Sequence, residues 1–246
     1  MTGYSAWSVV AFEVPTAAKW NLLGTNDTGF YNAITDIEAG WVPANETWTY
    51  ASATTITVPT GATNKYRVGD KIRLKQGGSY KYFSITVVAA TLLTVTGGTD
   101  YTVANSAITD NYFSHQENPF GFPYWFNFTS TWATSGTPPS LGNGALTGKF
   151  RLDGKWATVI INWSAGSTTT FGTGIWSFTL PFSGAASSAF NVKADDSGTA
   201  PYAMGAFTSA ALVYPIYQNT YVQNTAPFTW ATNDNIAMTG VLLTNL

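Results

Sequence analysis

The sequence has little of what most enzyme sites are built from. Its 246 residues include no cysteine and a single histidine, His115, with 11 Lys and Arg against 13 Asp and Glu. The absence of cysteine excludes disulfides and cysteine-based zinc or redox sites. Metal-ligand spacings, a Walker A loop and a Gly-x-Ser-x-Gly nucleophile elbow are missing as well. We therefore expect no catalytic residue, metal site or cofactor, and predict that the protein is not an enzyme.

The charge is also low, and it argues against two classes of partner. The formal net charge is −2 and the pI is about 5.2, whereas nucleic-acid surfaces are usually basic. No stretch approaches 18 continuous apolar residues, and Met1–Trp7 do not begin a secretory signal. We expect neither nucleic-acid binding nor membrane insertion.

The chain is rich in Thr, Ser, Gly, Asn and aromatic residues, including 10 Trp. Aromatic and β-branched residues favour strands over helices. The pattern predicts an all-β protein: a short N-terminal arm with a small helix, a small β-barrel, and a C-terminal β-sandwich that is jelly-roll-like.

Residues 1–45 form the predicted arm. The segment 15–23 begins like a helix, and the poor helix formers Gly24 and Gly29 should keep that helix short or broken. The arm either folds back on its own domain or docks into other subunits. The candidate anchors for docking are its spaced apolar residues: Trp7, Phe12, Trp20, Leu23 and Phe30.

Residues 46–117 are predicted to form the small barrel. The expected strands, separated by Gly and Pro turn signals, are 47–51, 54–58, 71–75, 81–88 and 92–96. Lys71, Arg73 and Lys75 share one strand face at period two. This face is interpreted as an ordinary solvated surface, the alternative being an anion-binding patch.

An aromatic and proline-rich connector, 118–140, leads to the predicted sandwich, 141–246. Asp153-Gly154 predicts a tight turn in a hairpin over 149–163. That hairpin places Phe150, Leu152 and alternate residues from Ala157 to Trp163 on a core face. On the other face Arg151 is expected opposite Trp156. Because that face still carries apolar side chains, we predict a subunit interface at Arg151, Trp156 and Ile160.

Several stretches resemble an N-terminal pattern of tailed-bacteriophage structural proteins. They include Val14-Pro15-Thr16-Ala17-Ala18-Lys19-Trp20, the segment 46–55, Val68-Gly69-Asp70-Lys71-Ile72-Arg73-Leu74, and the run from Tyr112 to Phe126. The resemblance covers residues 10–130 and implies a virion protein: a minor tail, fibre or receptor-binding protein, or a related head-attached one. It further implies a homotrimer with an N-terminal anchor and a β-rich head. It carries no catalytic residue.

These observations together predict a trimeric virion protein involved in host attachment. It would contact other virion proteins through its arm and a host surface glycan through loops of the sandwich. The candidate receptor residues are Tyr217, Tyr221 and Trp230, with packing in the core or trimer interface as the alternative for these aromatics. One alternative is a head-attached fibre or decoration protein. Another is a carbohydrate-binding or carbohydrate-cleaving virion protein, since two carboxylates suffice for a glycosidase.

Overall fold

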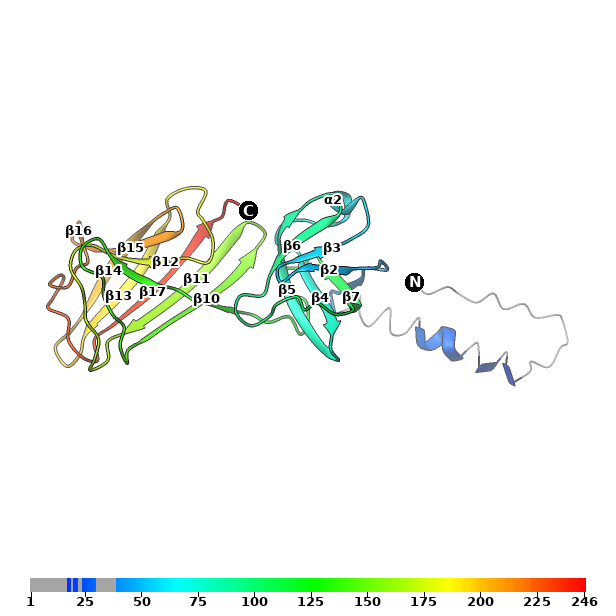
Figure 1. The fold of residues 1–246 in the computed structure, drawn as a ribbon, viewed down its shortest axis with the longest axis horizontal. Coiled ribbons are helices and arrows are strands. Elements are labelled where there is room, and N and C mark those ends of the chain that lie inside the picture. The colour runs from blue at the N-terminus through cyan, green and yellow to red at the C-terminus, as the bar shows by residue number, and fades with distance from the viewer. Residues whose placement is uncertain (1–16, 19, 22–23, 30–38) are drawn as a thin grey trace. The chain divides into compact units, whose positions relative to one another are not determined.

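The computed structural model of the chain describes residues 17, 18, 20, 21, 24–29 and 39–246. They form two compact units (Figure 1). The first comprises the described residues up to Val95 together with Val103–Phe122, and the second comprises Thr96–Thr102 and Pro123–Leu246. Both units are built on β-sheets, so the prediction of a mostly β chain with a small helix is confirmed.

The first unit holds a seven-stranded antiparallel sheet. In sheet order its strands are β1 (Val42–Pro43), β7 (Thr109–Ser114), β4 (Lys71–Gln76), β5 (Ser79–Val88), β6 (Leu92–Thr96), β3 (Thr55–Thr57) and β2 (Thr49–Ser52). A single helical turn, α2 (Ala62–Lys65), follows β3. Strand β1 lies within the predicted arm, yet it pairs with β7 at the edge of this sheet.

This first sheet is curled. Strands β7 and β2 are five positions apart, which would separate them by about 24 Å in a flat sheet. However, the Asn111 amide on β7 donates to the Glu46 carbonyl, three residues before β2, over 2.9 Å. The enclosed core includes Trp48, Ile72, Phe83 and further apolar residues from every long strand.

The outer face of β4 differs from the solvated surface that the sequence suggested. Lys71 is only 1% exposed, and its Nζ donates to the Gly69 carbonyl over 2.9 Å. The Arg73 guanidinium lies 4.2 to 5.3 Å from the ring centroids of Trp41, Tyr80 and Tyr112. Cation–π contact explains the error, because aromatic residues of which two, Trp41 and Tyr112, are distant in sequence pack over Arg73 on this strand face.

The second unit holds a ten-stranded antiparallel sheet. In sheet order its strands are β8 (Phe126–Phe128), β10 (Ala145–Asp153), β11 (Trp156–Ser164), β17 (Asn235–Leu243), β13 (Ala189–Asp196), β14 (Ala200–Ser209), β15 (Leu212–Tyr217), β12 (Trp176–Thr179) and β9 (Trp132–Thr134), with β16 (Thr220–Tyr221) also paired to β15. The predicted connector is shared between the units. Phe120 donates its backbone N–H to Ala39 in the first, whereas Phe126 pairs with Phe150 in the second.

The second sheet also curls, so that one face encloses a core. Trp163 on β11 and Trp176 on β12 are five strand positions apart, yet their ring centroids lie 5.3 Å from each other. The predicted core face of the hairpin is confirmed: Phe150, Leu152 and the alternate residues Ala157, Val159, Ile161 and Trp163 are all buried. Strict alternation on β11 therefore separates a core face from an outer face.

Candidate functional site

The predicted anchors fall mostly outside the described residues: Trp7, Phe12, Leu23 and Phe30. Trp20 is described, and it is helical and more than half exposed. Residues 24–29 are helical too, although Gly24 and Gly29 were expected to disfavour this. The Thr25 and Thr28 hydroxyls donate to the carbonyls four residues earlier, over 2.9 and 2.8 Å, which satisfies both side chains within the helix.

The hairpin that carries the predicted interface has a different register from the expected one. Asp153 pairs with Trp156, so the turn is Gly154-Lys155 and not Asp153-Gly154. Gly154 has φ of 58°, as a turn with glycine at its first central position requires. The shift moves the pairing by two residues, so the faces are as predicted, but Arg151 stands opposite Thr158 and not opposite Trp156.

Arg151 is engaged within its own unit. Its Nε lies 2.6 Å from Asp153 Oδ2, and its Nη1 donates to the Tyr124 hydroxyl over 2.6 Å. The guanidinium also lies 4.9 Å from the centroid of the Tyr124 ring. These contacts hold Arg151 flat on the outer face, beside the exposed Trp156 and the half-buried Ile160.

Trp156 and Ile160 belong to a larger uncharged surface, which we term the outer stripe. It consists of the outward residues of two paired strands: Trp156, Thr158, Ile160 and Asn162 on β11, and Ala237, Thr239, Val241 and Leu243 on β17. Trp156 is 53% exposed and Val241 is 48% exposed. The neighbouring strands carry charges on the same face, Lys149 and Arg151 on β10 and Lys193 on β13. The stripe is thus an apolar and neutral band with charged margins.

Trp230 is buried, which favours the packing alternative that the sequence left open for this residue. It is 3% exposed, and its Nε1 donates to the Gln223 carbonyl over 2.9 Å. It packs in an aromatic cluster with Trp132, Trp163 and Trp176, whose neighbouring ring centroids are 4.7 to 5.6 Å apart. Four tryptophans from separate strands and loops converge there because the sheet curls.

The other two receptor candidates lie on opposite sides of the sheet edge. Tyr221 on β16 is exposed and contacts the outward rings of Phe207 and Tyr214, with centroids 5.8 and 6.4 Å away. Tyr217 ends β15 on the core side, where its ring meets Tyr202 edge-to-face at 5.6 Å.

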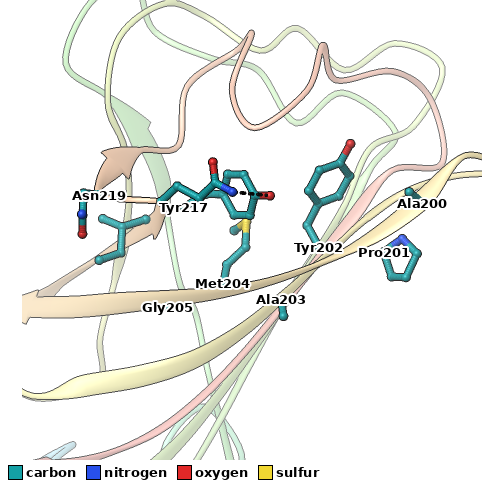
Figure 2. A pocket seen from close by; sticks show the side chains of 10 residues that line it. Ala200, Pro201, Tyr202, Ala203, Met204, Gly205, Tyr217 and Asn219 are labelled. Atoms are coloured by element: carbon teal, nitrogen blue, oxygen red, sulfur yellow. Dashed lines mark hydrogen bonds between the residues drawn. The ribbon is translucent and has the colours of Figure 1, made fainter.

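Tyr202 and Tyr217 line an open groove of about 640 Å³ at the end of β14 and β15 (Figure 2). One wall consists of residues 200–205 of β14. The other consists of residues 216–219, which are the end of β15 and the β15–β16 turn. Figure 2 shows Tyr202 and Met204 rising from the same side of β14. The side-chain amide of Gln218 lies beside the Tyr217 hydroxyl. That amide donates to the hydroxyl over 3.2 Å.

The side chains that line the groove include amides, phenols and a thioether. None of its lining residues is charged, and its polar side chains, Tyr202, Tyr217, Gln218 and Asn219, can each donate and accept hydrogen bonds. Of these, Tyr217 was predicted from the sequence. Tyr202 was missed because Ala200–Ser209 was not recognised as a strand, and Gln218 and Asn219 lie in the turn that follows Tyr217. Across the described residues, no three His, Asp or Glu side chains gather where they could hold a metal ion.

The first unit has its own polar cluster, centred on the partly buried Glu46. Its Oε1 accepts from Lys65 Nζ and its Oε2 from the Tyr66 hydroxyl, both over 2.6 Å. Burial alone would raise the pKa of Glu46, but hydrogen bonds from Lys65, Tyr66 and Trp48 outweigh it and lower this pKa. Burial and the Glu46 hydrogen bond raise the pKa of Tyr66 far above its ordinary range. This cluster ties α2 to the chain before β2, which gives it a structural role.

Comparison of the chain with protein families, characterised proteins and solved structures finds no match. Within the part of the chain that the structure describes, no helix is both long and apolar enough to span a membrane.

Proposed function

We propose that the protein is a structural component of a bacteriophage virion: a trimeric tail fibre or minor tail protein that takes part in host attachment. The resemblance of residues 10–130 to tailed-phage structural proteins supports this class. In this proposal the first unit is a small barrel, and the curled sheet of the second unit is a jelly-roll-like sandwich that forms the head.

The outer stripe is the observation that carries the proposal. An exposed Trp and Val on an uncharged band of sheet are typical of a surface that another subunit covers. Three copies related by a closed symmetry would bury this band on each chain without leaving an open partner surface. Trp156 and Ile160 would lie within that interface, and Arg151 at its charged margin.

The N-terminal segment supplies the attachment to other virion proteins in this proposal. Trp20 is exposed on a helix and makes no contribution to the core of either unit. Short segments bind by a few aromatic and aliphatic anchors, which Trp7, Phe12, Trp20, Leu23 and Phe30 would provide.

One observation separates the two forms of the carbohydrate alternative, binding and cleavage. Glycoside hydrolysis uses two carboxyl groups flanking the scissile bond, and no residue that lines the groove carries one. The groove therefore favours binding over cleavage, and binding is compatible with a virion head.

Imaging of the intact virion tests the proposal, through the position and copy number of this chain. We expect copies in multiples of three at the tail or at a fibre attached to the head. Absence of the chain from purified particles would contradict the proposal.

A further inference from the structure

We infer that the groove between β14 and the β15–β16 turn binds a neutral saccharide, with Tyr202 and Tyr217 as its aromatic platform and Gln218 and Asn219 as its polar rim. This inference deepens the proposed role in host attachment and rests on it for its biological setting. Its physical basis is confined to the second unit.

The chemistry of the lining selects the ligand class. No lining residue is charged, so an ionic ligand would lose its hydration without gaining a counter-charge. A purely apolar ligand would leave the amides and phenols without partners as it excluded water. A sugar presents hydroxyls that donate and accept, as the lining groups do, and C–H faces that can cover a tyrosine ring.

The aromatic platform is fixed by the packing behind it. Tyr202 meets Tyr217 at 5.6 Å and Phe228 at 4.9 Å, and Phe228 in turn lies 4.2 Å from Trp230. The groove wall is therefore continuous with the buried tryptophan cluster. Rings held in this way lose little conformational freedom when a ligand binds, which lowers the cost of binding.

The polar rim has an unusual backbone. Tyr217 pairs with Thr220, which leaves Gln218 and Asn219 as a two-residue turn with φ of 48° and 64°. Such turns favour glycine, since other residues at positive φ are strained. Gln218 thus holds a strained conformation at the edge of the groove, where its amide reaches the Tyr217 hydroxyl. Backbone strain of this kind is concentrated at binding sites, where the interactions that the side chain makes compensate for its cost.

A glycine substitution separates the side chain from the turn. In Gln218→Gly/Asn219→Gly the backbone conformation is retained and both amides are lost. Asn233→Gly is the matched control: Asn233 is exposed, has φ of 71° and lies outside the groove. Tyr217→Phe removes only the hydroxyl that accepts from Gln218.

The experiment is saturation-transfer NMR on the full chain, with methyl glycosides of glucose, galactose, mannose and N-acetylglucosamine as probes. Glucuronic and sialic acids are tested alongside them as charged probes. We expect at least one neutral probe to bind in the millimolar range, as is typical of a ligand of about a dozen non-hydrogen atoms. The double glycine variant should weaken it by about tenfold or more, Tyr217→Phe by a smaller factor, and Asn233→Gly not at all.

The inference is overturned if no neutral probe binds the folded wild-type chain, if only the acidic probes bind, or if the double glycine variant binds as well as the wild type. Assembly is read separately, by sedimentation of the same samples. A trimer that binds no sugar would refute saccharide binding in the groove and leave the proposal of a trimeric virion protein unaffected. A monomer that binds sugar would support saccharide binding and contradict the proposed trimer.

Discussion

At single positions, the aromatic residues of the second unit divide into core and surface groups. Trp230 is buried in the tryptophan cluster, whereas Tyr221 is exposed and contacts the outward rings of Phe207 and Tyr214. We expect Trp230→Ala to lower the free energy of unfolding by about 3–5 kcal/mol. Tyr221→Ala should lower it by about 1 kcal/mol or less. Urea denaturation of the two variants measures this difference, and equal losses would contradict the assignment.

Glu46 gives a pH-dependent prediction at the same scale. Its pKa is lowered in the folded chain, so its contribution to stability is present above its ordinary value of 4.5 and is lost as the pH falls through the lower folded value. We expect Glu46→Gln to destabilise the first unit by about 1–2 kcal/mol at pH 7. The difference should shrink towards zero at pH values below the folded pKa.

Hydrogen exchange of peptides from β3 and β4 is the measurement, since both strands lie in the unit that Glu46 supports. Peptides from β11 in the second unit serve as the internal control. A penalty that stays constant down to the lowest pH at which the chain remains folded would show that Glu46 acts by packing and not by its charge.

Among the strands, two glycines of the second sheet are contrasting sites for the same substitution. A Cβ on Gly240 of β17 would clash with the ring of Phe190, its buried partner on β13. A Cβ on Gly205 of β14 would meet nothing closer than 3.9 Å. We expect Gly240→Ala to cost about 1–3 kcal/mol of stability, and Gly205→Ala to be neutral or slightly stabilising. Thermal denaturation distinguishes them, and a stable Gly240→Ala would mean that Phe190 can repack.

The strands that were predicted are those with clear local patterns. Strand β6 has the bounds expected from the sequence, and the long hairpin β10–β11 was found from its alternation, although its turn was placed one residue early. Strands β7 and β14 were missed. Polar residues hide the pattern of β7, whose partners β1 and β4 are distant in sequence. Pro201 and Gly205 interrupt the pattern of β14, although it pairs with its sequence neighbours β13 and β15. Six of the ten residues that line the groove lie on β14, so they were missed with that strand.

Across the whole chain, the division into units depends on contacts that no local pattern contains. Residues 96–102 belong to the second unit, where Asp100 accepts hydrogen bonds from the backbone and side chain of Asn127. The segment lies inside the predicted barrel in sequence, and long-range contacts such as these bonds assign it elsewhere.

The N-terminal segment gives a prediction about incorporation into particles. Removal of residues 1–38 leaves intact the bond from Phe120 to Ala39 and the buried Trp41. We expect the truncated chain to fold with an unchanged melting temperature and to be absent from purified virions. Incorporation at the wild-type level would limit the segment to a packing role.

The most direct test of the account is sedimentation equilibrium of the full chain at micromolar concentration. We expect a single species of about 79 kDa, three times the chain mass of 26.4 kDa. Trp156→Lys/Val241→Lys should dissociate it to a folded monomer, because two charges would enter the covered stripe. Val87→Lys is the control, at a position in the first unit that is equally exposed, and it should remain trimeric. A wild-type chain that sediments as a stable, folded monomer, or a double lysine variant that remains a trimer, would contradict the assignment of the outer stripe as the subunit interface.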